Sequence, residues 1–211
     1  MNKKITLAIS KGRILKDTIP LLERMGMMPV EDLNKMRKLL IDTENPNVRV
    51  VVIRATDVPT YVQYGTADLG IAGKDVLMET QGEGIYELLD LGICQCKLMV
   101  AGKSEPPAEH SRLKIATKYV RSAQQYFAQQ GKQVEIIKLY GSMELAPITG
   151  LADLIVDLVD TGNTLRANGL QPLEHIADIS SRLVANKASL KVRFDTLQDI
   201  VEQFRSAIEN N

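Results

Sequence analysis

The chain has 211 residues, of which 26 are Lys or Arg and 26 are Asp or Glu, so its formal net charge is zero with both His neutral. A neutral chain exerts no long-range attraction on a polyanion, which argues against a general binder of nucleic acid or of membrane surfaces. The 45% of hydrophobic residues can fill a core, and at about 150 residues per domain the length suits one sizeable domain or two small ones. No apolar stretch approaches the ~20 residues of a membrane span, and the start does not resemble a signal peptide, so we expect a cytoplasmic protein.

In chain order, the first part alternates short apolar runs with amphipathic stretches, the pattern of an α/β fold. We predict strands at 5–9, 48–53 and 67–72, and helices at 14–25, at 58–64 and from 76. Each strand ends in a polar turn: Ser10-Lys11-Gly12-Arg13, Arg54-Ala55-Thr56-Asp57 and Gly73-Lys74-Asp75. The carboxyl ends of parallel strands share one sheet edge, where α/β proteins bind ligands, so cations in these turns are candidates for binding an anion. The alternative for each cation is a solvated surface charge without a ligand. The alternative for Asp57 and Asp75 is to cap the helix that follows.

Extended chain at 88–102 leads to a second set of elements. We predict strands at 114–117, 134–139 and 153–159, helices at 120–130 and 143–149, and a C-terminal amphipathic helix at 194–209. These elements predict two small α/β domains with a cleft between them. Domain I comprises residues 1–90 plus 182–211, and domain II comprises residues 91–181.

The cysteines and histidines lack the spacing of a redox or metal site. Cys94 and Cys96 are too few to staple a domain of this size, and we expect reduced, buried thiols on one face of a strand. His110 and His175 have no partners at metal-ligand spacing, so we expect neither to be catalytic.

The strand and turn at 152–165 form the most specific segment of the sequence. A buried strand delivers Asp157 and Asp160 into the turn Thr161-Gly162-Asn163-Thr164, which opens a short helix. A glycine lets the backbone approach a ligand closely, and successive N–H groups form a nest for phosphate oxygens. Acids beside such a nest suit a ligand that also carries hydroxyls or a metal, such as a phosphorylated ribose with Mg²⁺. Alternatively, Asp160 caps the helix and the threonines bond the local backbone.

This segment resembles the signature of the ATP phosphoribosyltransferase family, which opens histidine biosynthesis. The matching positions are Glu144, Gly150, Ala152, Ile155, Asp157, Leu158 and residues 161–165. The three polar turns of the first part also resemble that family, so the similarity covers essentially the whole chain.

The resemblance implies a fold of two α/β domains like those of periplasmic solute-binding proteins, with the active site in the cleft. It also implies the reaction, in which N1 of ATP attacks C1 of phosphoribosyl pyrophosphate and pyrophosphate leaves. Mg²⁺ is implied as the cofactor, carried by the substrate phosphates rather than by protein metal ligands. An oxocarbenium-like transition state of this kind needs positioning and electrostatic stabilisation more than acid–base chemistry.

The resemblance also assigns roles to particular residues. Thr161, Gly162, Asn163 and Thr164 would bind the ribose 5-phosphate, with Asp157, Asp160 and Glu144 towards the ribose hydroxyls or magnesium. Asp153, at the start of its strand, would be structural. Arg54 and Lys11 would be catalytic, stabilising the departing pyrophosphate. Substrate would further be bound by Gly12, Arg13, Lys74 and Asp75, while Arg37 would reach the ATP triphosphate, a neighbouring subunit or only solvent.

The chain length points to the short form of this family. Long members carry an additional C-terminal regulatory domain, for which 211 residues leave no room. The short form implies a homodimer that assembles with a separate regulatory subunit similar to histidyl-tRNA synthetase. Two other functions stay open from the sequence: a non-catalytic solute-binding or ligand-sensing module, and a phosphoribosyltransferase acting on a free base.

Overall fold

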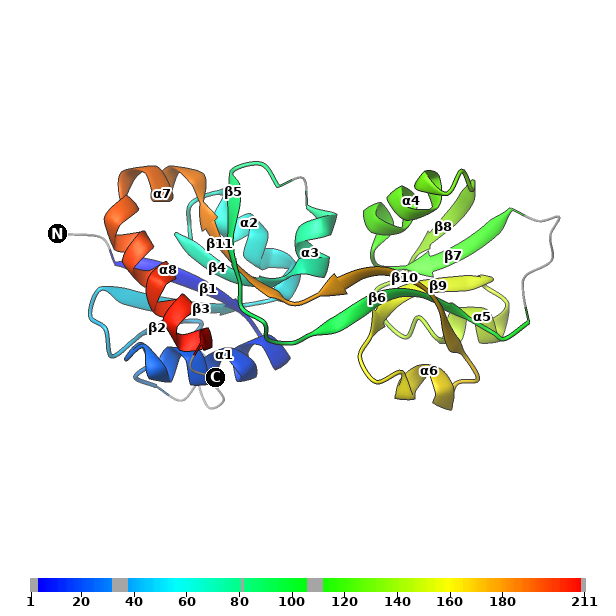
Figure 1. Ribbon diagram of the computed structural model, residues 1–211, viewed down its shortest axis with the longest axis horizontal. Coiled ribbons are helices and arrows are strands. Elements are labelled where there is room, and N and C mark those ends of the chain that lie inside the picture. The colour runs from blue at the N-terminus through cyan, green and yellow to red at the C-terminus, as the bar shows by residue number, and fades with distance from the viewer. Residues whose placement is uncertain (1–3, 32–37, 81, 106–111, 210–211) are drawn as a thin grey trace. The chain divides into compact units, whose positions relative to one another are not determined.

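The computed structural model describes residues 4–31, 38–80, 82–105 and 112–209. The chain divides into two compact units (Figure 1), unit 1 comprising Met1–Cys94 and Ser180–Asn211 and unit 2 comprising Gln95–Ile179. The sequence placed these boundaries at 90/91 and 181/182, four and two residues away. The difference arises because Leu91 donates its N–H to Ser181 and Ser181 donates to Ile93, which ties these crossing segments to unit 1.

Unit 1 is built on a six-stranded sheet of order β2-β3-β1-β4-β11-β5. Its parallel strands are β1 (Ile5–Ser10), β3 (Val48–Ile53) and β4 (Leu69–Gly73), with β3 and β4 on either side of β1. The other three strands are β2 (Leu40–Asp42), β5 (Ile85–Asp90) and β11 (Ser181–Asn186). β1 is buried at every position, as expected for a strand covered on both faces.

Helices cover both faces of this sheet (Figure 1). α1 (Arg13–Arg24) and α8 (Phe194–Glu209) pack on the larger core with Leu7, Ile9 and Phe204. α2 (Val58–Gln63) packs on the other face with Ala8 and Val184. Three short helices complete unit 1: the 3₁₀ helix η1 (Ala55–Asp57), α3 (Lys74–Glu79) and α7 (Lys187–Val192).

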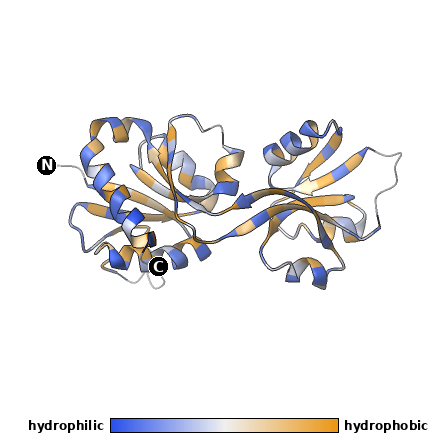
Figure 2. Cartoon of the chain, viewed as in Figure 1, coloured by the Kyte–Doolittle hydropathy of each residue, from blue (hydrophilic) through white to orange (hydrophobic). Residues whose placement is uncertain are grey.

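Unit 2 is built on a five-stranded sheet of order β10-β6-β9-β7-β8. β7 (Leu113–Thr117) runs parallel to β8 (Val134–Lys138) and β9 (Leu154–Val159), whereas β6 (Cys96–Gly102) and β10 (Gln171–Ile179) pair antiparallel. Its helices are α4 (Val120–Gln129), α5 (Leu145–Thr149) and α6 (Asn163–Ala167). In both units the hydrophobic residues concentrate along the strands (Figure 2), which is where the cores lie.

The prediction for the two cysteines was wrong in its local structure. Cys96 begins β6, but Cys94 precedes the strand in a bend with a φ of 54°, so the two thiols do not share a strand face. Both cysteines are free and only partly buried. The sequence also missed β2, β10, β11 and α7, because their apolar runs are short or interrupted by polar residues.

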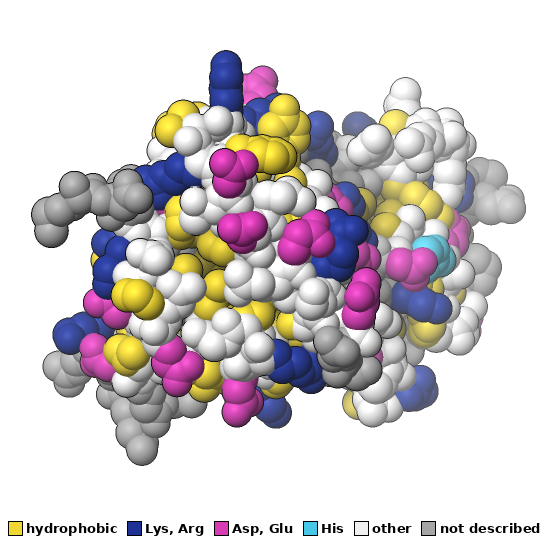
Figure 3. Space-filling model, turned by 60° about the vertical axis from the view of Figure 1, so that its left-hand side comes forward, with side chains coloured by type: hydrophobic (Ala, Val, Ile, Leu, Met, Phe, Trp, Pro, Cys, Tyr) yellow, Lys and Arg dark blue, Asp and Glu magenta, His cyan; other side chains and the backbone are white. Residues whose placement is uncertain are grey.

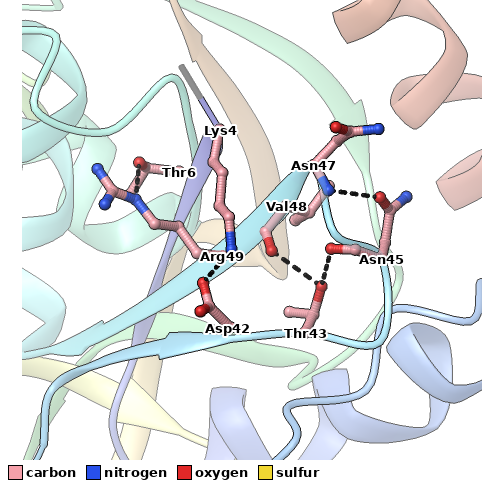
Figure 4. Close-up of polar contacts among 8 residues, drawn as sticks. All are labelled: Lys4, Thr6, Asp42, Thr43, Asn45, Asn47, Val48 and Arg49. Carbon is pink, nitrogen blue, oxygen red and sulfur yellow. Dashed lines mark hydrogen bonds and ion pairs between the residues drawn. The ribbon is translucent and has the colours of Figure 1, made fainter. Parts of the chain in front are cut away.

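Polar side chains close the amino edge of the unit 1 sheet (Figure 4). Lys4 pairs with Asp42 at 2.7 Å, linking β1 to β2, and Arg49 Nε donates to Thr6 Oγ1 at 2.9 Å, linking β3 to β1. The turn between β2 and β3 is fastened by Thr43 Oγ1, which donates to Val48 O at 3.0 Å. These polar groups bond one another and are therefore structural.

None of the helices in the described ranges combines the length and the apolar content that crossing a bilayer requires.

Candidate functional site

The three polar turns of unit 1 lie at one edge of its sheet, as the sequence predicted. Ser10 of β1 is in register with Ile53 of β3, and Ile9 is in register with Ile71 of β4. The residues after these three strands therefore emerge next to one another at the carboxyl edge. This edge of an α/β sheet is the usual place for a ligand.

Lys11 and Arg54 are exposed cations that immediately follow the adjacent strands β1 and β3. The backbone holds them in place: Lys11 N–H donates to Ile53 O at 2.8 Å, and Gly12, with a φ of 91°, turns the chain into α1. Within the described ranges, neither the Lys11 ammonium nor the Arg54 guanidinium has a hydrogen bond or ion pair with another residue. Two unpaired cations at the ends of neighbouring strands are suited to an anion of high charge.

Arg13 lies at the start of α1, with its Nε 3.8 Å from Asp17 one helical turn later. Asp17 in turn accepts a hydrogen bond from the Cys94 thiol at 3.1 Å. Burial raises the pKa of Cys94, and the hydrogen bond and charge of Asp17 raise it further, to about 12. Cys94 is therefore a protonated donor at neutral pH rather than a reactive thiolate.

Lys74 and Asp75, in the third turn, have partners within unit 1. Lys74 Nζ lies 2.7 Å from Glu87 Oε2 on β5, and each side chain is about one-third exposed. Asp75 is buried in the first turn of α3 and is not its cap residue, because the N-cap position is Gly73. The Asp75 carboxylate lies against Gly73, where a Cβ would displace it. Asp57 occupies the N-cap position of α2, as the sequence predicted, but its side chain makes no capping hydrogen bond.

Glu87 belongs to a charge network that the sequence analysis missed. Arg182 on β11 lies 3.3 Å from Glu87 and 3.0 Å from Asp90, and Ser180 Oγ donates to Asp90 at 2.7 Å. Burial acts to raise the pKa of Asp90, but hydrogen bonds from Gly92 and Ser180 and the positive charges of Arg182 and Lys74 outweigh it, so the pKa is lowered. Only a correct prediction of β5 and β11 as neighbours would have revealed this network.

In unit 2, the turn 157–164 lies at the carboxyl edge of the parallel strands. Thr117 of β7 is in register with Val156 of β9, and Asp157 Oδ1 accepts from Leu158 N–H at 2.8 Å. Gly162, with a φ of 72°, occupies the N-cap position of α6, so Asp160 does not cap this helix. Asp153 lies at the opposite end of β9, where its Oδ2 accepts from Lys114 N–H at 2.8 Å, a structural contact as predicted.

The side chains of this turn are available to solvent. Thr161, Asn163 and Thr164 are exposed, and Gly162 is partly buried. Arg166, which the sequence analysis did not single out, lies across the turn: its Nη2 donates to Thr161 O at 2.9 Å and to Asn163 Oδ1 at 2.6 Å. The only sequence signal for this contact was the three-residue spacing of Asn163 and Arg166 at the start of a helix.

The structure says less about the other residues that the sequence analysis named. Glu144, partly buried, occupies the N-cap position of α5 after β8, without a capping hydrogen bond. His175 Nε2 lies 3.0 Å from exposed Asp178, while Arg37 and His110 fall outside the described residues. Acidic and basic side chains are interspersed on the face turned to the viewer in Figure 3, in keeping with zero net charge.

Comparison with known proteins identifies the family. The family model described as ATP phosphoribosyltransferase matches residues 54–208. The chain belongs to the ATP phosphoribosyltransferase family. A relative of that name from Hydrogenovibrio crunogenus is 61% identical over 208 residues, covering 99% of this chain and 100% of the relative. Another from Pseudomonas aeruginosa is 60% identical over 205 residues, covering 97% of each. The chain is thus a pentosyltransferase of histidine biosynthesis, acting at its first step.

Solved structures agree with this assignment. The ATP phosphoribosyl transferase (HisG:HisZ) complex from Thermotoga maritima superposes with a TM-score of 0.86 at 31% identity, covering 98% of this chain and 100% of the matched chain. The periplasmic aliphatic sulphonate binding protein SsuA from Escherichia coli superposes with a TM-score of 0.61 at 15% identity, covering 99% of this chain and 73% of SsuA. The second match shows the fold alone. Two α/β domains with a fold like that of periplasmic binding proteins, expected from the sequence, are thereby confirmed.

Proposed function

We propose that this chain joins N1 of ATP to C1 of phosphoribosyl pyrophosphate, with the turn 157–164 holding the ribose 5-phosphate and the cations of unit 1 stabilising the pyrophosphate. In this step the N1 lone pair forms the new bond to C1, and the bond from C1 to the pyrophosphate oxygen breaks with its electron pair leaving on pyrophosphate. The observation that carries the proposal is the family signature in a turn at the carboxyl edge of unit 2.

The chemistry of the turn suits a phosphorylated sugar. Thr161, Gly162, Asn163 and Thr164 offer backbone N–H groups and uncharged side-chain donors for a phosphate. Asp157, Asp160 and Glu144 offer carboxylates to the ribose hydroxyls. The proposed division of labour is that the neutral donors bind the phosphate and the acids bind the sugar.

The unpaired cations suit the leaving group. Lys11 and Arg54 are exposed and have no partner among the described residues, so no salt bridge must break before they meet an anion. Pre-positioned charge lowers a barrier most where charge develops in the transition state. We therefore assign Arg54 and Lys11 to the departing pyrophosphate, with Arg13 and the Gly12 backbone in support.

The acidic residues of the turn are compatible with Mg²⁺, the metal that the family resemblance implies. Asp157 and Asp160 supply carboxylate oxygens, the ligands this cation prefers. Across the described part of the chain, no three His, Cys, Asp or Glu side chains are grouped so as to hold a metal by themselves. We propose, from the family resemblance, that substrate phosphates carry the ion, which when bound would neutralise charge on pyrophosphate.

The proposal extends to assembly and location. A solved relative is a HisG:HisZ complex, and by analogy we propose that this chain forms a homodimer which assembles with a separate regulatory subunit similar to histidyl-tRNA synthetase. We propose the cytoplasm as its location because its two substrates are metabolites of that compartment. Light scattering during size-exclusion chromatography, with and without the partner, tests the assembly.

An ultraviolet assay tests the activity directly. Purified chain is mixed with ATP, phosphoribosyl pyrophosphate and Mg²⁺, with and without the regulatory subunit, and the adenine spectrum is followed. We expect a spectral change that requires both substrates, because N1 substitution alters the adenine ring. No change under either condition would overturn the transferase and favour a module that only binds solutes. Replacing ATP by adenine tests transfer to a free base.

A further inference from the structure

The guanidinium of Arg166 spans the turn proposed to bind the 5-phosphate. Its Nη2 donates to the carbonyl of Thr161 at 2.9 Å and to Oδ1 of Asn163 at 2.6 Å. A Cβ placed on Gly162 would lie 3.1 Å from Arg166 Nη1, so the guanidinium also lies close over this glycine. Arg166 therefore bonds two residues of the turn and lies close to the glycine between them.

The contact with Asn163 fixes the orientation of its side-chain amide. A guanidinium carries only donors, so the amide atom bonded to it must be the oxygen. The Asn163 NH₂ group has no hydrogen-bond partner among the described residues. Arg166 thereby engages the acceptor of this amide and leaves its two donor hydrogens for another group.

The bonds of Arg166 run back to the residues that precede and open α6, a helix of only five residues. Arg166 lies in the last turn of α6, where a cation ordinarily stabilises the final carbonyls of the helix. Its side-chain bonds go instead to residues 161 and 163, at the beginning of the helix. Helical side chains lean towards the N-terminus, which brings this guanidinium over the turn.

The amide orientation matters because a phosphate only accepts hydrogen bonds when fully ionised. An amide that presents its oxygen repels the phosphate, whereas one that presents its NH₂ group binds it. We infer that Arg166 is a positioning residue that holds Asn163 as a donor towards the 5-phosphate, an inference that rests on the function proposed for this turn.

The test measures phosphoribosyl pyrophosphate binding in the presence of Mg²⁺ by calorimetry, together with kcat and both KM values. For Arg166→Ala we expect Kd and KM for phosphoribosyl pyrophosphate to rise about 10-fold, the size of one hydrogen bond to a charged group, with kcat and KM for ATP little changed. Arg166→Lys keeps the positive charge but loses the planar guanidinium with its several donors. The Kd and KM of this variant for phosphoribosyl pyrophosphate should fall between those of wild type and Arg166→Ala. Wild-type affinity in Arg166→Ala, or an equal rise in both KM values, would overturn the inference.

Arg112→Ala is the matched control. Arg112 Nη2 also donates to a backbone carbonyl, that of Val134 at 3.4 Å, but at the amino edge of the unit 2 sheet. The Arg112→Ala variant loses the same charge from the same unit as Arg166→Ala, but away from the turn. The affinity of this variant for phosphoribosyl pyrophosphate should therefore stay at the wild-type value. If Arg112→Ala lost as much affinity as Arg166→Ala, the loss of one positive charge would explain both effects, and the inference would be overturned.

A double-mutant cycle with Asn163→Ala tests the mechanism itself. If Arg166 acts through the Asn163 amide, Arg166→Ala should weaken binding much less in the Asn163→Ala background than in wild type. Strictly additive losses would overturn the inference. Failure of the wild-type chain to bind phosphoribosyl pyrophosphate would instead overturn the proposed function of the turn, and this inference with it.

Discussion

The carboxyl edge of the unit 1 sheet has two halves that both carry cations. In one half the cations are unpaired among the described residues, and in the other they form ion pairs. Over β1 and β3, Lys11 and Arg54 are exposed and, among the described residues, have no partner. Over β4, β11 and β5, Lys74 and Arg182 are held by Glu87 and Asp90 at 2.7 to 3.3 Å.

The difference lies in the acids that each half carries. β5 supplies Glu87 and Asp90 to the second half, so its cations are largely neutralised before any ligand arrives. The first half keeps its positive charge. A chain of zero net charge can thus present positive potential locally, because neutralisation occurs in one half of an edge and not in the other.

The largest expected effect is on the unpaired half. Arg54→Ala should lower kcat by about 100-fold, because its charge matters most as pyrophosphate departs, with less effect on KM. Steady-state kinetics measures both constants. The control is Arg49→Ala on the same strand, since Arg49 already bonds Thr6 at the amino edge and should leave kcat unchanged. An unchanged kcat in Arg54→Ala would contradict the proposal that the unpaired cations stabilise the departing pyrophosphate.

The next effect concerns the stability of the paired half. Arg182→Ala should lower the free energy of unfolding by about 1 to 2 kcal/mol, because it leaves Glu87 and Asp90 close together without their shared cation. Urea unfolding followed by circular dichroism measures this loss. Lys4→Ala is the comparison, since its pair with Asp42 is more exposed and should cost under about 1 kcal/mol. Equal losses would indicate that the network adds nothing beyond a surface pair.

A smaller effect is expected at Lys74, which the resemblance assigned to substrate binding. Because Glu87 already engages its ammonium, Lys74→Met should change kcat and both KM values by less than about 3-fold, roughly 0.6 kcal/mol. The measurement is the same kinetic assay used for Arg54→Ala. A loss of tenfold or more would return Lys74 to the substrate-binding residues and show that its pair with Glu87 opens for the substrate.

The smallest expected effect is a dependence of stability on pH. The pKa of Asp90 is lowered from its ordinary value of 3.8 in the folded protein, so Asp90 contributes stability above that value and loses it as the pH falls through the lowered pKa. Thermal melts from about pH 5 to about pH 2.5 should therefore show a steeper decline for wild type than for Asp90→Asn. Parallel declines would indicate that Asp90 carries no favourable interaction.

Much of the fold could be predicted from local patterns in the sequence. The strand at 48–53 and the helix at 194–209 were predicted with the observed bounds, because the first is a short apolar run and the second has a clear helical period. The Cys94 bend and the choice of Gly162 rather than Asp160 as the N-cap of α6 could not be predicted, because each depends on a backbone angle set by neighbouring segments. Strands β10 and β11 were missed because polar residues interrupt their apolar runs, and only pairing with β6, β4 and β5 makes them strands.

The sequence by itself determined the family, the α/β class and the polar turns that follow strands β1, β3, β4 and β9. Only the tertiary structure decided which of these polar residues are paired: Lys74 with Glu87, Arg182 with Asp90, and Arg166 with Asn163, while Lys11 and Arg54 have no partner in the described ranges. The physical reason is distance. Hydrogen bonds and ion pairs act over a few ångströms of space, and strand order brings residues from distant parts of the sequence within that reach.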